Sequence, residues 1–501
     1  MSFSFVYHVR EKLPKLAWLA QVDSSRGIAE VYCGTKVERH EAFFVTGVWD
    51  GEYLSADFDS CDAFYGTGAK LTQDGVLFVT PSHALERVVL AEREGKVIVS
   101  NSLPFLMEHI GAELDRKICS YESIMCSMLN GPDGIQDIPL SNGDAIKQFI
   151  VSNILVTEQG IKPCRRPVMK PFVNFEDYYT RITASLEAIR RNIEAPERSA
   201  RFGLVSTISS GYDSSACCAL ARTIGCERIV ALSGGQYDKD DGTSVAEMMG
   251  YTDIQKRDKN LYKSTRGCID ALYVSSGDLG TELQFSVFDD LFEDNLVFIG
   301  SRGSYWNKSF DVTDDFEMKG YYYFETSVSY TEDMLRLGAV YAPLPAFGAS
   351  VASSIKRVSN SEEMRPWSVG GSYDKPIPRR IVESVGVPRE AFGMKKYGGG
   401  FSFGYDNMSR IKRKMSTEGF ESFAQFRKQH KGSKNGLHKL GCKIKYGIQI
   451  SPVYFNLAMG KMRLPFKIKQ KPLTVANPGA PADLIFWGID YMKARYSEAM
   501  A

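Results

Sequence analysis

Short apolar runs separated by turn-forming residues make up most of the first 160 residues. Phe43–Trp49, Val76–Thr80 and Val97–Ser100 are rich in β-branched and aromatic residues, and Gly, Asp, Asn and Ser lie between these runs. Such runs are typical of short strands joined by tight turns. A short helix is expected at Leu103–Ile110 and a further strand pair around Phe149–Val156. The pattern predicts a strand-rich and turn-rich domain over residues 1–162.

A proline-rich segment and an amphipathic stretch follow. Pro163, Pro167 and Pro171 mark a stiff linker, which we place at residues 163–173. Beyond it, apolar side chains recur every three or four positions, which predicts a helix with one apolar face. These side chains are Phe175, Tyr178, Ile182, Leu186, Ile189 and Ile193. We interpret this helix as a packing element that leads into a second domain.

Continuous apolar runs replace the short ones in the second domain. Residues 202–208, 228–233 and 295–299 have the length and composition of buried parallel strands, and residues 251–258 fit a further strand. Helix-compatible segments lie between them, at residues 214–223 and from about Thr243. Strands that alternate with helices are typical of an α/β domain. We expect a parallel sheet with helices on both faces over residues 174–404, followed by a C-terminal extension over residues 405–501.

Composition narrows the class of protein. A chain of 501 residues with 44% hydrophobic and 24% charged residues is long for a single core, so two domains are expected. The net charge of +1 gives no general attraction to nucleic acid or to a membrane. Ten cysteines without a CxxC pair indicate neither a zinc site nor a disulfide framework. Without an apolar signal core or a run of about 20 apolar residues, a cytoplasmic protein with no membrane span is expected.

The turn Ser209–Ser214 joins the first buried strand to a helix. Free backbone N–H groups and the positive helix end converge at such a turn, which favours an anionic ligand. Gly211 allows close approach of the backbone, and Asp213 is a candidate ligand for Mg²⁺. By itself, the turn fits equally well a serine-rich cap of the following helix.

The residues Ser209-Ser-Gly-Tyr-Asp-Ser214 resemble the SGGxDS pyrophosphate loop of ATP-pyrophosphatases, with Ser210 in place of the usual second residue, Gly. The order of motifs over residues 75–400 is similar to that of asparagine synthetases and their relatives, the β-lactam synthetases and lasso-peptide cyclases. That family activates a carboxylate as an acyl-adenylate and forms an amide. The resemblance implies ATP and Mg²⁺ as cofactors, a HUP/PP-loop α/β domain, and before it an α+β two-sheet sandwich like the Ntn-hydrolase glutaminase domain.

The resemblance also assigns candidate site residues. Counting from Pro388 places Lys396 on the family's catalytic lysine, with Lys395 beside it, and Asp213 on a metal ligand. The segment after the strand at residues 295–299 corresponds to a second pyrophosphate loop, and the end of the strand at residues 228–233 to nucleotide contacts. The nucleotide-binding candidates are Ser209, Ser210, Gly211, Asp213, Ser214, Ser215, Leu232, Ser233, Gly300, Arg302 and Gly303.

Three positions depart from the family pattern. Ser2 stands where the glutaminase has a nucleophilic cysteine, so we expect no glutaminase activity. Ser304 stands where a second aspartate would share the magnesium, and Met394 where an arginine would lie. Asp213 then remains the only motif-matched metal ligand unless an acidic residue of the following segment reaches the site, while Arg302 could hold phosphate directly. Those acidic residues are Asp311, Asp314 and Asp315.

The C-terminal extension is strongly basic. From Arg410 to Lys471 it has sixteen Lys or Arg residues against Glu418 and Glu421. A solvated basic face explains this charge, and so does an electrostatic platform for an anionic acceptor.

The sequence therefore predicts an ATP-dependent amide-forming enzyme without its own glutaminase. Its acceptor would be a carboxylate on a small molecule, glycan, nucleotide sugar or peptide, and its donor an amine or ammonia, free or from a partner glutaminase. No nucleic-acid partner is expected, and a homodimer is compatible with the sequence. The alternative is a nucleotide-binding pseudoenzyme, because the family residue is missing at Ser2, Ser304 and Met394. Sulfur transfer to tRNA is weakly supported, since it needs active-site cysteines and only Cys268 is a candidate.

Overall fold

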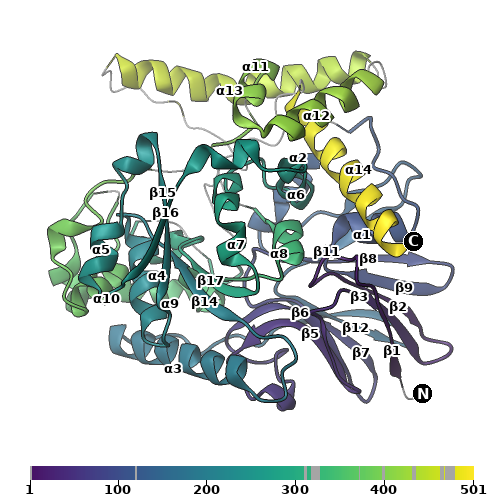
Figure 1. Ribbon diagram of the computed structural model, residues 1–501, viewed down its shortest axis with the longest axis horizontal. Coiled ribbons are helices and arrows are strands. Elements are labelled where there is room, and N and C mark those ends of the chain that lie inside the picture. Colours follow the sequence, from purple (N-terminus) through teal and green to yellow (C-terminus); the bar gives the residue numbers. More distant parts are fainter. Residues whose placement is uncertain are drawn as a thin grey trace.

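The computed structural model describes residues 3–118, 121–309, 313–316, 328–371, 373–397, 401–404, 406–430, 436–462, 468 and 480–501. Within this range the chain forms two sheet-containing halves joined by the helix α3 (Phe175–Glu194), with a set of helices from the C-terminal part along one side (Figure 1).

The N-terminal half is a sandwich of two sheets. The seven-stranded sheet has the order β1-β3-β2-β9-β8-β11-β10, and the six-stranded sheet the order β13-β12-β7-β6-β5-β4. The first contains β1 (Ser4–Val9), β2 (Trp18–Asp23), β3 (Ile28–Cys33), β8 (Val88–Arg93), β9 (Lys96–Ser100), β10 (Ile138–Pro139) and β11 (Ala145–Phe149). The second contains β4 (Glu38–Arg39), β5 (Phe43–Trp49), β6 (Phe64–Leu71), β7 (Gly75–Val79), β12 (Ser152–Thr157) and β13 (Gly160–Arg165).

Alternating apolar side chains of both sheets fill the space between them. Trp18 stacks on Phe78 with ring centroids 5.9 Å apart, and its indole N–H donates to Thr67 Oγ1 at 2.9 Å. The ring of Phe44 meets the edge of the same indole, so that one tryptophan joins the two sheets. The helices α1 (Leu103–His109) and α2 (Tyr121–Cys126) lie between β9 and β10 in the sequence. The strands expected from the short apolar runs are therefore present.

The second half contains a five-stranded sheet in the order β16-β15-β14-β17-β18, and every neighbouring pair is parallel. Its strands are β14 (Gly203–Thr207), β15 (Arg228–Ser233), β16 (Asp253–Asp258), β17 (Asn295–Ile299) and β18 (Val340–Pro343). The chain runs outward from β14 to β16 and then returns to the other side of β14. The strand order therefore reverses between β14 and β17, which is where open α/β sheets bind ligands.

Helices flank this parallel sheet, as an α/β domain requires. Figure 1 shows α4 (Tyr212–Arg222), α5 (Thr243–Met248) and α10 (Pro376–Ser384) to the left of the sheet, with α7 (Asp289–Phe292) and α8 (Thr331–Leu337) to its right. The helix α6 (Ile269–Ser276) and the helix α9 (Ala352–Ser359) complete the set before the C-terminal part.

The two halves share a continuous core and several buried polar contacts. Arg198 forms an ion pair with Glu38 across the interface at 2.5 Å, with both side chains buried. Arg87 donates to Gln148 at 2.6 Å and also to the carbonyl of Ser276 in the second half. These contacts fix the sandwich against the α/β half, because an arginine left unpaired at such a site would be costly.

Four helices form the C-terminal part of the described chain. They are α11 (Met408–Lys414), α12 (Thr417–Gln429), α13 (Gly436–Lys461) and α14 (Pro481–Met500). The helix α14 packs against α6 and against α1 of the sandwich, where Tyr496 stacks on Phe105 with centroids 4.7 Å apart. Among the described helices, none combines the length and apolar character needed to cross a membrane.

Candidate functional site

A cavity of about 360 Å³ opens at the point where the strand order reverses. The ends of β14 and β17 and the turns after them form one side of it, and aromatic side chains form the other. Of the candidate site residues, the cavity wall contains Ser209, Gly211, Asp213, Ser214, Gly300, Arg302, Gly303, Lys395 and Lys396. The topology thus brings together two turns and a lysine pair that lie almost 200 positions apart in the sequence.

The first turn is held in shape by its own hydroxyl groups. Ser214 Oγ accepts from the backbone N–H of Ser209 at 3.0 Å, and Ser209 Oγ accepts from Gly211 N–H at 3.2 Å. Ser215 donates to the carbonyl of Ser209 at 3.1 Å. Ser210 turns outward and donates to Asp240 Oδ1 at 2.7 Å. Ser210 and Ser215 therefore support the turn, while Ser209, Gly211 and Ser214 face the cavity.

The second turn approaches the first so closely that it needs glycine at two positions. A Cβ atom on Gly303 would lie 2.1 Å from Asp213 Cγ, and one on Gly300 would lie 2.9 Å from the backbone nitrogen of Ser214. Arg302, between them, has a φ of 67°. Its guanidinium donates to the carbonyls of Ala84 at 2.8 Å and Val328 at 3.4 Å. The sandwich half thus holds this turn, and much of the hydrogen-bonding capacity of Arg302 serves that contact.

Lys375 completes the site, and the sequence analysis did not find it. Its ammonium donates to both carboxylate oxygens of Asp213, at 2.8 and 2.6 Å, and to the carbonyl of Gly303 at 2.7 Å. The side chain is only 7% exposed. Burial lowers the pKa of Lys375, and the charge of Asp213 opposes that effect. Lys375 lies just before α10 and outside any motif, so the one available signal was the need of Asp213 for a counter-ion.

Lys395 and Lys396 approach the cavity from the segment that follows α10. The positive charge of Lys396 also acts to lower the pKa of Lys375, which indicates that the two ammonium groups are near one another. Lys395 Nζ lies 5.4 Å from the centre of the Tyr397 ring, a cation–π distance. Together with Lys375, these residues place three cations around one side of the cavity.

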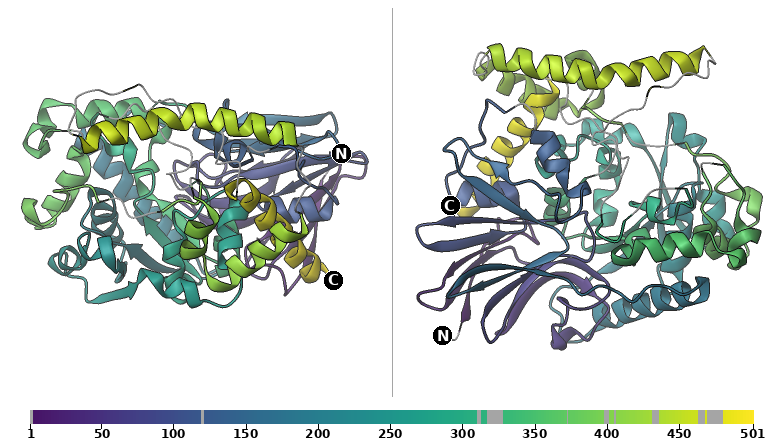
Figure 2. Two further views of the ribbon diagram at one scale, coloured as in Figure 1. Left: turned by 90° about the horizontal axis from the view of Figure 1, so that it is seen from above. Right: turned by 180° about the vertical axis from the view of Figure 1, so that it is seen from behind.

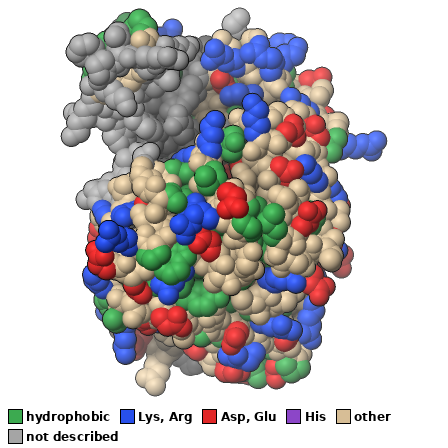
Figure 3. Space-filling view, turned by 90° about the vertical axis from the view of Figure 1, so that its left-hand side faces the viewer, with side chains coloured by type: hydrophobic (Ala, Val, Ile, Leu, Met, Phe, Trp, Pro, Cys, Tyr) green, Lys and Arg blue, Asp and Glu red, His purple; other side chains and the backbone are tan. Residues whose placement is uncertain are grey.

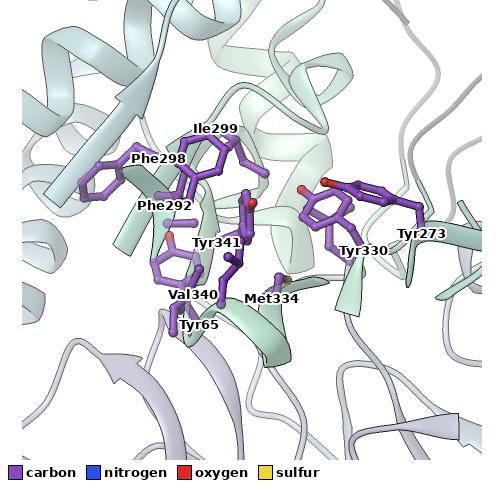
Figure 4. Close-up of a cluster of buried hydrophobic side chains, with 14 of the residues drawn as sticks. Tyr65, Tyr273, Phe292, Phe298, Ile299, Tyr330, Met334, Val340 and Tyr341 are labelled. Carbon is purple, nitrogen blue, oxygen red and sulfur yellow. The ribbon is translucent and has the colours of Figure 1, made fainter. Parts of the chain in front are cut away.

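Aromatic side chains line the opposite side. Tyr273, Tyr330 and Tyr341 lie together in Figure 4, with Phe292 and Ile299 beside them, and Tyr330 meets Tyr341 edge to face at 4.8 Å. Burial raises the pKa of these three tyrosines well above the usual value, so their hydroxyl groups stay protonated. Glu282, Phe285 and Tyr237 also line the cavity. The cavity wall therefore combines lysine, aromatic and carboxylate side chains.

The predicted nucleotide contacts at the end of β15 lie outside the cavity wall. Leu232 is buried and Ser233 is half-buried, whereas Tyr237 and Asp240 of the next segment do line the cavity. Burial raises the pKa of Asp240, while its bond from Ser210 opposes that rise. A role of Leu232 and Ser233 in nucleotide binding stays a prediction.

The residues around Asp213 do not fit a resident magnesium ion. Lys375 occupies both carboxylate oxygens, and among the described residues no group of three His, Cys, Asp or Glu side chains is placed to hold a metal. Asp314 accepts two bonds from Ser353, each at 2.7 Å, and Asp315 contacts Thr313. Asp311 and Ser2 lie outside the described residues.

Among the residues that the structure describes, no cysteine lines this cavity. Cys268 lies at the start of α6 and lines a different cavity of about 200 Å³. Cys217 and Cys218 are buried in α4, and burial raises the pKa of both thiols. A protonated, buried thiol is a poor nucleophile, so sulfur transfer gains nothing from this arrangement.

Comparison with known proteins shows only distant structural similarity. No family model and no curated protein matches the chain. Among solved structures, it is similar to glutamine-dependent NAD⁺ synthetase from Acinetobacter baumannii in complex with adenosine diphosphate. The identity is 13%, the match covers 91% of this chain and 85% of that chain, and the TM-score is 0.22. Two chains with so low a score superpose poorly, and the match carries no argument about the activity of this one.

Proposed function

We propose that this protein is an ATP-dependent amide-forming enzyme. In the reaction, a carboxylate oxygen attacks the α-phosphorus of ATP, pyrophosphate leaves, and an amine then displaces AMP from the acyl-adenylate. The observation that supports this best is that both turns and three lysines line a single cavity. An anionic leaving group needs such a concentration of fixed positive charge and N–H donors. The resemblance of the first turn to the SGGxDS loop points the same way.

The roles of the residues follow from their positions. The turn at Ser209–Ser214 and the N-terminus of α4 would bind pyrophosphate through backbone N–H groups and serine hydroxyls. Lys375 would neutralise phosphate charge, while Asp213 orients its ammonium group. Lys396, with Lys395 beside it, would stabilise the charge that develops in the transition state.

Mg²⁺ is expected here only as the ion that accompanies ATP. With Lys375 on both oxygens of Asp213, the protein itself offers no vacant carboxylate at the first turn. Magnesium is commonly bound through substrate phosphates with few protein ligands, so the nucleotide would bring most of its ligands.

The aromatic side chains of the cavity wall, such as Tyr273, Tyr330 and Tyr341, would contact the body of the carboxylate substrate. A volume of about 360 Å³ is at the lower end of the range for small-molecule sites, so only the reacting part of a larger acceptor would enter. The donor would be ammonia or an amine supplied from outside. The first cysteine, Cys33, is buried in the sandwich, and burial raises its pKa to about 11, so it is no candidate for a glutaminase nucleophile.

The test is nucleotide chemistry followed by mass spectrometry. Purified protein is incubated with ATP, Mg²⁺ and sets of carboxylates, with and without ammonia, while AMP and pyrophosphate are measured. AMP that rises with one class of acid, and is lost in Asp213→Ala, is the expected result. Unchanged turnover in that variant would contradict the proposal.

A second candidate is a nucleotide-binding pseudoenzyme. The ion pair between Asp213 and Lys375 favours it, because the pair leaves the family's metal ligand already occupied. This candidate predicts a thermal shift with ATP and no AMP with any acid. Acid-dependent AMP would exclude it.

A further inference from the structure

The helix α13 presents apolar side chains to solvent along most of its length. Leu440, Ile444 and Ile448 are 54%, 55% and 68% exposed, and Phe455 and Met462 are 38% and 56% exposed. Their spacings of four, four, seven and seven residues place them on one face of the helix. We call these five residues the α13 stripe. Ile450 is buried and lies about 120° around the helix from the centre of the stripe, so α13 packs through a different part of its surface.

The helix α13 lies at the periphery of the molecule. In Figure 1 the helix lies along the top of the structure, and the turned views of Figure 2 show it again along the outer edge. Soluble proteins rarely leave a long apolar stripe open to water unless it serves an interaction.

Lysines flank the stripe on both sides. At 100° per residue, Lys443 lies about 60° before Leu440, and Lys445 lies about 60° beyond Ile448. Both lysines are exposed. The charges of the surrounding sequence are all positive, since residues 422–482 contain twelve Lys or Arg and no Asp or Glu. Figure 3, which views the molecule from the left-hand side of Figure 1, shows several Lys and Arg side chains near its upper edge, while both signs mix lower down.

We propose that α13 binds the surface of an anionic phospholipid bilayer. The helix lies in the plane of the interface, with the stripe among the acyl chains and the flanking lysines at the lipid phosphates. An apolar face bordered by lysines is the arrangement that such binding requires. Aliphatic side chains bury well in acyl chains, and the excess of positive charge selects anionic headgroups.

Charge decides against the other occupants of this face. Two copies of the chain packed stripe to stripe would bring their lysine borders together, which is unfavourable. A single-stranded nucleic acid would meet the lysines, but the stripe is mainly aliphatic and offers one aromatic ring for base stacking. Only the bilayer uses both the apolar and the charged parts of the helix.

The experiment is flotation of the full-length protein with vesicles on a density gradient. One set of vesicles is phosphatidylcholine, and the other contains about one third phosphatidylglycerol. The protein is expected to float with the second set only, and less at high salt. The double variant Ile444→Ser/Ile448→Ser removes apolar area without changing charge, and its affinity should fall roughly tenfold or more. Lys443→Gln/Lys445→Gln should lose roughly tenfold to thirtyfold.

The matched control is Val168→Ser/Val173→Ser, which removes two side chains that are 69% and 77% exposed elsewhere on the surface. It should float as the unchanged protein does. No flotation with either vesicle set, or equal flotation with both, would overturn the proposal. It would also be overturned by a dimer that Ile444→Ser/Ile448→Ser dissociates in the absence of lipid.

Discussion

Asp213 and Lys375 lie 162 positions apart, yet their side chains form the ion pair at the centre of the cavity. A buried ammonium needs a counter-charge, and a carboxylate at a glycine-rich turn supplies it together with the carbonyl of Gly303. The same closeness explains why Gly303 carries no side chain. At the residue scale, Asp213, Lys375 and Gly303 therefore each need the other two in place.

Removal of both partners of this pair should cost less than the sum of the costs of removing each alone. In Asp213→Asn, Lys375 stays buried without its counter-charge, and in Lys375→Met the half-buried carboxylate of Asp213 loses its ammonium partner. The double variant leaves neither charge. Its loss of unfolding free energy should therefore be smaller than the sum of the two single-variant losses, by roughly 0.5–3 kcal/mol. Urea denaturation of the four proteins measures this coupling. Additive losses would show that the pair contributes nothing as a pair.

Gly303→Ala should lower the activity strongly, through steric contact alone. Its φ lies outside the left-handed region, so backbone strain plays no part, but the new Cβ would lie 2.1 Å from Asp213 Cγ. Displacement of the ion pair should lower AMP formation by roughly a hundredfold. The matched control is Gly441→Ala in α13, where a Cβ has no neighbour within 4 Å. Equal activity of both variants would contradict this account of the second turn.

At the element scale, regular features were predictable and tertiary ones were not. The strand at residues 228–233 and the helix from Phe175 are present where the apolar pattern placed them. Burial of a strand, or of one face of a helix, requires apolar residues at regular positions, and these can be recognised in the sequence. The turn after β14 was found because its chemistry is local. Lys375 and the tyrosine-rich wall escaped prediction since they come from separate segments and meet only through folding. The solvent-facing stripe of α13 was also missed, because periodicity does not say which face is buried.

The docking of α14 offers a test at the same scale. Tyr496 donates to Glu332 Oε2 at 2.7 Å, while Ser102 donates to Oε1 at 2.6 Å. Tyr496→Phe leaves half of this buried carboxyl unsatisfied and should lower the free energy of unfolding by about 1–3 kcal/mol. Tyr454→Phe, at a side chain that is 57% exposed, is the matched control and should have no effect. Similar stabilities of the two variants would show that the contact is dispensable.

The whole molecule places several carboxyl groups in its shared core. Burial raises the pKa of Glu86 to about 8, and those of Asp278 and Glu332 to about 7. The folded state thus binds protons more tightly than the unfolded chain. The contribution of these groups to the free energy of unfolding is fully present below their pKa values in the unfolded chain. It is lost as the pH rises through their pKa values in the folded state.

The free energy of unfolding should therefore fall between about pH 5 and pH 8. Glu86→Gln cannot ionise, so its stability should fall less over this interval, by roughly 2–4 kcal/mol. Urea denaturation at a series of pH values compares it with the unchanged protein and with Glu41→Gln, a change at an exposed position. If Glu86→Gln and the unchanged protein have parallel pH profiles, Glu86 does not titrate as its burial requires.

The measurement that tests the central claim most directly is carboxylate-dependent exchange of labelled pyrophosphate into ATP. Exchange requires adenylation of an acid and its reversal, and it proceeds without any amine. The account predicts label in ATP only when the right acid is present, and none in Asp213→Ala. Label that enters ATP without an acid, or no exchange with any acid although ATP binds, would contradict the claim that this cavity adenylates a carboxylate.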